Sequence, residues 1–145
     1  TGIYNTDAIV SEGRVHVLDF GARLGGNMLG EVHRLATGVD YTLAAIQLAM
    51  GETPKIARSD TEMNAGHLVV HSDRHGTLQE INFSETLRDL TAIELISKQR
   101  GASVQPYGST SDRLGILVLQ SPNREKLIEV YQNPIPHFGL VLDNP

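Results

Sequence analysis

Hydrophobic and polar positions along the first twenty residues predict two β-strands. Residues 3–10 and 15–20 are rich in β-branched and aromatic side chains, and a turn signal around Gly13 separates them. Two such runs on either side of a short polar turn are typical of a β-hairpin. A glycine-dense segment, residues 21–27, follows the second run. The pattern therefore predicts a hairpin that leads into a flexible loop.

Helical spacing of apolar residues appears after this loop. Residues 28–35 predict a short helix, and residues 41–50 predict a longer one. Asp40 is a favourable N-cap for the second helix, and Gly51 stands where a helix commonly ends in a left-handed residue. The character of the sequence changes at residues 52–54, and we place a boundary between two lobes there.

The rest of the chain predicts a mixture of strands and helices. Apolar runs predict strands at residues 67–71, 77–81, 103–106, 114–120 and 139–142. A capping box at Asn82 and Glu85 predicts the start of a helix that runs to Gly101. This helix would present Leu87, Leu90, Ile93 and Ile96 on one face. A second helix is expected to start at Ser121-Pro122 and to bury Leu127, Ile128 and Tyr131.

Composition narrows the classes of function. The chain has 145 residues with a formal net charge of −5, so a broad nucleic-acid surface is not expected. It contains no cysteine, which excludes disulfides, thiolate metal sites and cysteine nucleophiles. We find no apolar run long enough to span a bilayer and no signal peptide, and we expect a cytoplasmic protein without membrane contact. Because the sequence starts without Met and directly in a strand, we expect a piece of a longer protein.

Asp7 and Asp19 are the strongest candidates for chemistry in the hairpin. If the turn spans three residues, 12–14, the two aspartates lie opposite each other on one face. Like charges that face each other across two strands repel, so a cation between them is expected. Mg²⁺ takes a few carboxylates together with water and phosphate oxygens. A turn of two or four residues would place one aspartate elsewhere, and the pair would then be unrelated.

The segment after Asp19 adds groups that bind anions. Gly25, Gly26 and Asn27 precede a helix, and backbone N–H groups in such a loop can point at a phosphate. Arg23 supplies a planar guanidinium suited to phosphate or carboxylate oxygens. Taken alone, each feature is also explained by an ordinary turn or a solvated side chain. Together they predict phosphoryl or acyl-phosphate chemistry.

These motifs resemble the end of an ATP-grasp domain. The resemblance rests on Asp7 in the first strand, on the run from Asp19 through Arg23 to Asn27, and on the Thr-Gly-Val-Asp sequence that ends at Asp40. It is nearest to the carboxylate–amine and amino-acid ligases related to biotin carboxylase and phosphoribosylamine–glycine ligase. It covers residues 1–52 well. A weaker resemblance to the C-terminal domain of these enzymes follows at residues 112–122, before and after an apolar strand.

The resemblance implies a role for each matching residue. Asp7 and Asp19 would bind magnesium, Arg23 would act catalytically on the γ-phosphate or the acyl phosphate, and Gly25, Gly26 and Asn27 would approach the phosphate or the acid substrate. The chain departs from the family in two respects. Both acids are aspartate where the family has glutamate, and Gly21 replaces an asparagine that binds metal in the family.

The implied fold class is α+β. Residues 1–52 would form the end of an ATP-grasp lobe, in which antiparallel strands carry helices on one side, and residues 53–145 would form a small C-terminal α/β domain. The implied activity belongs to a larger ligase that uses ATP and Mg²⁺, with Mn²⁺ as an alternative, to join a carboxylic acid to an amine. The expected partners are these two small molecules and the missing N-terminal part of the same ligase. A homodimer is a further alternative.

Other interpretations stay open at this stage. A non-catalytic interaction module could retain the same scaffold, and the departures at Asp7, Asp19 and Gly21 favour it slightly. A metal-dependent hydrolase has less support. His67, His71 and His75 recur every fourth residue, but a strand would hold the first two roughly 13 Å apart, too far for one zinc ion. Glu31 and His33 could reach a substrate, but they are expected on a solvent-facing helix. The polar loop before Arg113 could approach the site or form a simple turn.

Overall fold

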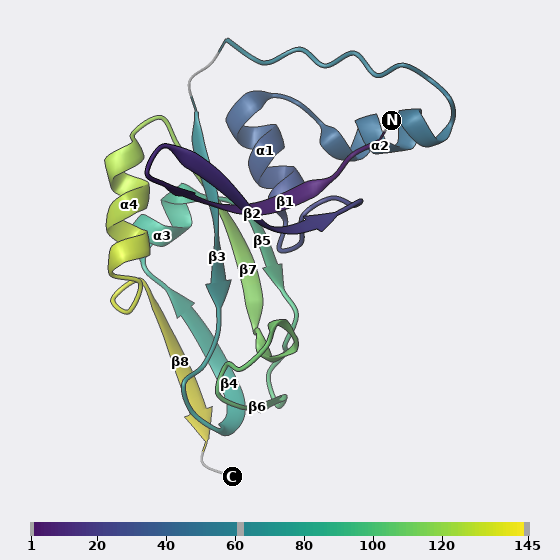
Figure 1. Ribbon diagram of the computed structural model, residues 1–145. Helices are drawn as coiled ribbons and strands as arrows, with labels where there is room; N and C mark the ends of the chain where they lie inside the picture. Colours follow the sequence, from purple (N-terminus) through teal and green to yellow (C-terminus); the bar gives the residue numbers. More distant parts are fainter. Residues whose placement is uncertain (1, 61–62, 144–145) are drawn as a thin grey trace.

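The computed structural model describes residues 2–60 and 63–143, and in this part of the chain it contains three small antiparallel sheets with four α-helices (Figure 1). The α+β class predicted from the sequence is confirmed. The elements in chain order are β1 (Asn5–Ser11), β2 (Arg14–Gly21), α1 (Leu29–Thr37), α2 (Tyr41–Ala49), β3 (Asn64–Val70), β4 (Gly76–Phe83), α3 (Glu85–Leu90), β5 (Thr91–Ile96), β6 (Ser103–Val104), the 3-10 turn η1 (Thr110–Asp112), β7 (Gly115–Ser121), α4 (Arg124–Gln132) and β8 (Phe138–Asp143).

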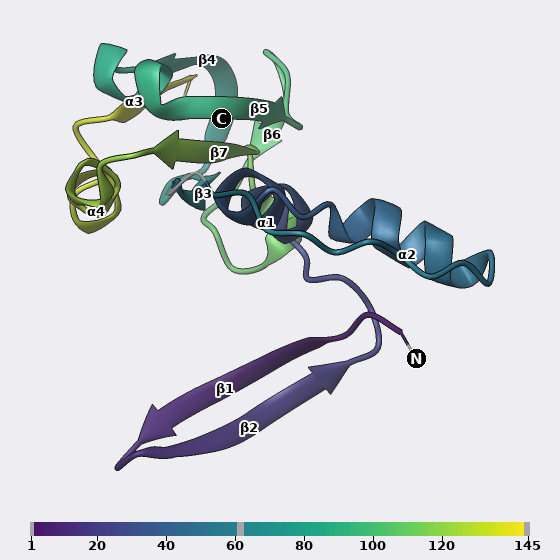
Figure 2. The same ribbon diagram turned by 90° about the horizontal axis from the view of Figure 1, so that it is seen from above.

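The predicted hairpin is present as β1 and β2, but its turn is shorter than expected. Ser11 pairs with Arg14, so the turn consists of Glu12 and Gly13, and the three-residue turn was wrong. Glu12 and Gly13 have φ values of 52° and 72°, and two central residues with positive φ are typical of the tight turns that suit a twisted hairpin. The hairpin projects away from the other two sheets (Figure 2). Its apolar side chains are consequently exposed.

The two predicted helices of the first third are confirmed as α1 and α2. The carboxylate of Asp40 accepts a hydrogen bond from the Leu43 N–H at 2.8 Å, as expected of an N-cap. Gly51 has φ of 79° directly after Met50, the C-cap of α2, as predicted for a glycine that follows the end of this helix. Helix α1 packs against β3 and β7, and this contact connects the glycine-rich segment before α1 to the main body of the protein.

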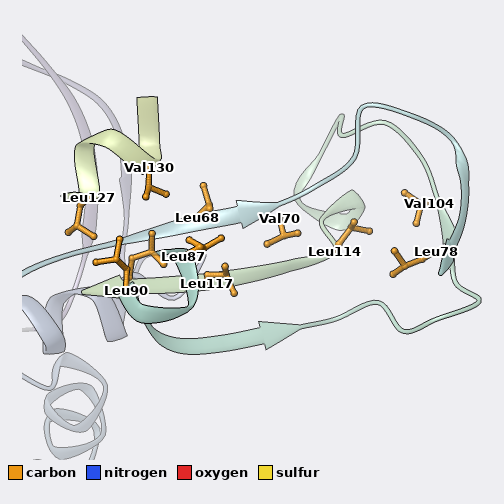
Figure 3. Close-up of a cluster of buried hydrophobic side chains, with 11 residues drawn as sticks. Leu68, Val70, Leu78, Leu87, Leu90, Val104, Leu114, Leu117, Leu127 and Val130 are labelled. Carbon is orange, nitrogen blue, oxygen red and sulfur yellow. The ribbon is translucent and has the colours of Figure 1, made fainter. Parts of the chain in front are cut away.

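The hydrophobic core lies around β7, the central strand of the sheet β3-β7-β5. Figure 3 shows leucine and valine side chains from this sheet, from α3 and α4, and from the third sheet, β6-β4-β8, meeting in one cluster. Leu114, Val118 and Leu119 are fully buried. The continuous apolar run that predicted a strand here is explained by burial of β7 on both faces.

The helix predicted from Asn82 to Gly101 was wrong in its second half. Helix α3 starts after Ser84, whose hydroxyl accepts the Leu87 N–H at 3.1 Å, and it ends at Leu90. Residues 91–96 form β5, which pairs with β7. The side chains of this segment include β-branched threonine and isoleucine, which fit a pleated strand well. Pairing with the buried β7 thus overrides the helical spacing of Ile93 and Ile96.

The last helix also differs in detail from the prediction. Asn123, rather than Ser121, caps α4 by accepting the Glu125 N–H at 2.8 Å. Leu127 is buried as expected, but Val130 takes the second core position, and Tyr131 remains 37% exposed. In the described residues, no helix is both long enough and apolar enough to cross a membrane.

Candidate functional site

Asp7 and Asp19 are register partners on the two strands of the hairpin. From the two-residue turn to Ala8, the two strands pair in a regular register, with Ser11 opposite Arg14 and Ala8 opposite Val17. The register then shifts by one residue, and Leu18 forms a bulge. Without this shift, Asp7 would pair with Leu18. The predicted opposition of the two aspartates is therefore present, although the turn that was to produce it is not.

The two aspartates face each other without a compensating cation among the described residues. The ion pairs in this part of the chain join Arg34 to Glu31 and Arg74 to Asp73, and none involves the hairpin acids. Opposed like charges on neighbouring strands destabilise a sheet. Across the described residues, no group of three or more histidine, aspartate or glutamate side chains that could hold a metal ion is present. The aspartate pair could therefore supply only two protein ligands. Two carboxylates suit Mg²⁺, which usually completes its shell with water and phosphate oxygens.

Asn5 connects this acidic pair to the glycine-rich segment. Its side-chain amide nitrogen donates to Asp7 Oδ1 at 3.3 Å. Its amide oxygen lies 3.0 Å from the position that a Cβ on Gly25 would occupy, and Leu29 Cδ1 lies only 2.6 Å from the same position. Gly25 therefore allows a close approach between the loop, β1 and α1. Asn5 was not predicted from the sequence, because its contact with Gly25 depends on how the loop folds back.

The loop itself is held in an unusual backbone conformation. Asn27 and Met28 have φ values of 52° and 63°, in the left-handed region that glycine and asparagine adopt but methionine rarely does. Met28 is the N-cap of α1 and provides no side-chain cap. Gly26 faces open space, since no atom lies within 4 Å of the Cβ position built on it. The loop therefore presents open backbone next to the start of a helix, where an anion is favoured.

Arg23 lies beside this loop and is exposed. Its Nη1 donates to the carbonyl oxygen of Leu24 at 3.0 Å, and its side chain passes over Gly21. A Cβ on Gly21 would meet the Arg23 side chain at 3.6 Å, an ordinary contact. The absence of a side chain at position 21 is therefore not a steric requirement of the described neighbours.

A cavity of about 620 Å³ opens beside the glycine-rich segment. Its wall includes Gly25, Leu29, Ala44 and Leu48, and it is mainly apolar. His33 also lines it and packs edge-on against Tyr41 at 5.5 Å between ring centroids. The sequence had indicated that His33 lies on a solvent-facing helix, with contact to a substrate as the alternative, and His33 is exposed on α1. The position of the cavity would let a molecule with an apolar part reach the loop.

Two other sequence-based candidates take structural roles. Glu31 accepts a hydrogen bond from Arg34 Nε at 2.8 Å within α1, in keeping with its expected place on the surface of a helix. His67 lies on β3 opposite Val118, and burial lowers its pKa from 6.5. Strand β3 ends at Val70, before His71.

One further contact reaches the loop from the distant end of the chain. Arg113 Nη1 donates to Asn27 Oδ1 at 3.2 Å, across 86 residues of sequence. The sequence had indicated that the polar loop before Arg113 could approach the site. The side chain that makes the approach is Arg113 itself, which sequence analysis did not select as a site residue.

Comparisons with known proteins identify the fold. No protein-family model matches the chain, and a search of curated proteins found no match. Among solved structures, phosphoribosylglycinamide synthetase from Anaerococcus prevotii matches 97% of this chain with a TM-score of 0.80 and 19% identity. L-amino acid ligase from Bacillus licheniformis matches 99% with a TM-score of 0.79 and 20% identity. Biotin carboxylase from Campylobacter jejuni matches 99% with a TM-score of 0.58 and 13% identity.

The chain spans 37%, 36% and 32% of these three structures, respectively. Its fold is therefore that of about a third of each of these enzymes, in keeping with the resemblance of its sequence to the end of an ATP-grasp ligase. At these levels of identity the likeness concerns the fold.

Proposed function

We propose that this chain is the C-terminal part of an ATP-dependent carboxylate–amine ligase. Residues 1–52 would carry the metal- and phosphate-binding groups, and residues 53–145 would form a C-terminal domain that supports them. The observation that carries the proposal is the link from Asp7 through Asn5 to Gly25, which sets a carboxylate pair beside an open glycine loop. The fold shared with two enzymes named as a synthetase and a ligase supports the same conclusion.

In the proposed reaction, a carboxylate oxygen of the acid attacks the γ-phosphorus of ATP, and ADP leaves. An amine then attacks the carbonyl carbon of the acyl phosphate and loses a proton, and phosphate leaves as the amide forms. Magnesium would screen the negative charge on the phosphates. Asp7 and Asp19 fit as its protein ligands because they are opposed and lack a cationic partner in the described residues.

The remaining roles follow from position. The backbone at Gly25 and Gly26 and the Asn27 side chain would hold the transferred phosphoryl group or the carboxylate that accepts it. Arg23 would place positive charge where negative charge develops in the transition state. The cavity next to Gly25 would receive an apolar part of the acid substrate.

The direct test is product analysis with the full-length protein. Mg-ATP is incubated with pairs drawn from a panel of amino acids, other carboxylic acids and amines, and ADP, AMP and phosphate are measured. The proposal expects ADP and phosphate in equal amounts, and only when an acid is present. AMP formation, or no ATP turnover with any pair, would count against it.

A non-catalytic interaction module is the second candidate. It is favoured by Gly21, which removes a side chain that binds metal in the family that the chain resembles, and by the apolar side chains exposed on the hairpin. Titration of the full-length protein with Mg²⁺ and ATP separates the two candidates. Absence of binding for both would favour the interaction module.

A further inference from the structure

Arg113 belongs to the second part of the chain and contacts the proposed phosphate loop. It directly follows η1 and lies two residues before the start of β7. Its hydrogen bond to Asn27 Oδ1, at 3.2 Å, joins this region to the glycine-rich segment. The two residues are 86 positions apart in the sequence, so the contact connects the two halves of the protein.

The backbone of Arg113 is fixed by the core. Leu114, its neighbour in sequence, is fully buried, and its N–H donates to the carbonyl oxygen of Val70 at 2.8 Å. On the other side, Asp112 Oδ2 accepts the N–H of Gly108 at 3.1 Å and that of Ser109 at 2.8 Å. Hydrogen bonds from Gln105, Ser109 and Gly108 lower the pKa of the Asp112 carboxyl. Arg113 therefore projects from an ordered part of the chain.

Asn27, by contrast, belongs to a segment that needs support. Its φ of 52° and the φ of 63° at Met28 are left-handed. Asparagine adopts this conformation more readily than most residues, but methionine keeps it only when neighbouring contacts hold it. Within the described residues, the Asn27 side chain accepts a hydrogen bond from Arg113, which is distant in the sequence. An ordered donor thus meets an acceptor that directly precedes the strained residue Met28.

The charge of Arg113 is also uncompensated within the described part of the chain. The ion pairs found there involve Arg34 and Arg74, and no carboxylate lies within 4.0 Å of the Arg113 guanidinium. A guanidinium has five N–H donors, and the bond to Asn27 uses one of them. Arg113 is partly buried, so its positive charge lies beside the loop rather than free in solvent.

We infer that Arg113 is a positioning residue for the Gly25–Asn27 segment. It orients the Asn27 side chain and so keeps the backbone of the glycine-rich loop ready for a phosphate-like anion. The inference rests on the proposed function, because that proposal assigns the loop to a phosphoryl or carboxylate group. It adds that the C-terminal domain contributes to the site through one named side chain.

Inorganic phosphate is the probe that tests Arg113 without a known substrate. It is titrated into the ¹⁵N-labelled full-length protein, and the amide signals of Gly25 and Gly26 are followed. The wild type should show a saturable shift, and R113A should raise the apparent Kd for phosphate about tenfold or more, as expected for loss of a hydrogen bond from a charged group. No shift in the wild type, or an equal Kd in R113A, overturns the inference.

A matched control and a double-mutant cycle show whether Arg113 acts through Asn27. Arg100 Nε donates to Gln79 Oε1 at 3.1 Å, an arginine–amide pair elsewhere on the surface, so R100A should leave the Kd unchanged. N27G keeps the left-handed backbone and removes the acceptor. It should weaken phosphate binding as R113A does, and R113A should then add little in the N27G background. Independent, additive losses would overturn the positioning role.

If R113A fails to fold, R113Q replaces it in the cycle with N27G, because glutamine removes the guanidinium and keeps most of the volume of the side chain. An N27G protein with the Kd of the wild type would overturn the inference. The phosphate titration is independent of catalysis. If ATP turnover is absent but R113A and N27G weaken phosphate binding, the ligase proposal fails and the role of Arg113 stands.

Discussion

Asp7 lies opposite Asp19 because β2 contains a one-residue bulge at Leu18. The regular register that starts at the two-residue turn would have paired Asp7 with an apolar side chain. The bulge places the two carboxylates on directly opposed positions of the two strands, where they repel each other. An arrangement that costs stability in the absence of a ligand is a common feature of binding sites.

Neutralising one of these acids should have opposite effects on the stability of the metal-free protein and on the binding of Mg²⁺. D7N removes a like-charge repulsion, so we expect it to stabilise the protein slightly, by a few tenths of a kcal/mol, in the absence of divalent cations. It should also abolish the stabilisation that Mg²⁺ gives the wild type. Thermal unfolding with and without MgCl₂ measures both effects.

The matched control is E12Q, which neutralises an acid at the turn of the same hairpin. It should leave the response to Mg²⁺ intact. Mn²⁺ provides a second readout, because it should broaden the amide signals near Asp7 and Asp19 before those near Glu12. Equal broadening along the hairpin would argue against a site at the aspartate pair.

The hairpin also shows what the sequence could predict. The two strands and the identity of the two opposed acids were predicted correctly, because strand propensity and residue type are local properties. The length of the turn was not, and the bulge at Leu18 compensated for the error. A bulge depends on the twist of both strands, and no single residue in β1 or β2 predicts it.

Alanine substitutions at Gly25 and Gly26 should differ in their effect on the stability of the protein. In G25A the new Cβ would lie 2.6 Å from Leu29 Cδ1 and 3.0 Å from Asn5 Oδ1, so the side chains must shift. We expect a loss of about 1–3 kcal/mol of stability, typical of overpacking. In G26A the Cβ meets nothing within 4 Å, and stability should change by less than about 0.5 kcal/mol.

G26A should weaken the binding of inorganic phosphate, although it leaves the stability of the protein nearly unchanged. A methyl group at this open position would stand where a phosphate approaches the loop, so the Kd for inorganic phosphate should rise although the fold is unchanged. Urea unfolding and phosphate titration of both variants provide the comparison. A G26A protein that binds phosphate as tightly as the wild type would exclude Gly26 from the site.

Position 21 offers a gain-of-function test. A Cβ at this position lies no closer than 3.6 Å to the Arg23 side chain, so the first atom of an added side chain makes only an ordinary contact. G21N would add an amide oxygen near Asp19, and we expect tighter Mg²⁺ binding by calorimetry. G21A is the control, since it adds the Cβ without an oxygen ligand. Equal affinities in G21N and G21A would contradict a metal site at this end of β2.

The parts of the site that sequence analysis missed are those that depend on distant contacts. Asn5 reads as an ordinary residue at the start of a strand, and only the fold brings it next to Gly25. Arg113 follows a polar loop, and its contact with Asn27 spans 86 residues. The switch from α3 to β5 has the same origin, because β5 exists through its pairing with β7.

His67 predicts how stability depends on pH. Burial of its imidazole on β3 lowers the pKa below the value of 6.5 that an unfolded chain would have. In the window between 6.5 and the folded-state pKa, the unfolded chain therefore binds more protons than the folded protein. The free energy of unfolding then rises with pH through this window. The contribution of His67 is fully present above pH 6.5 and is lost as pH falls toward the folded-state pKa.

Two measurements check this linkage. The pKa of His67 is obtained from the Cε1 proton signal in the folded protein, and urea unfolding is followed between pH 5 and 7.5 for the wild type and H67Q. The wild type should lose stability more steeply than H67Q as pH falls below 6.5, since glutamine cannot take up the proton. A folded-state pKa at or above 6.5, or equal slopes for the two proteins, would contradict the role of burial. The prediction is independent of the ligase proposal, because His67 packs opposite Val118 in the sheet that contains β7.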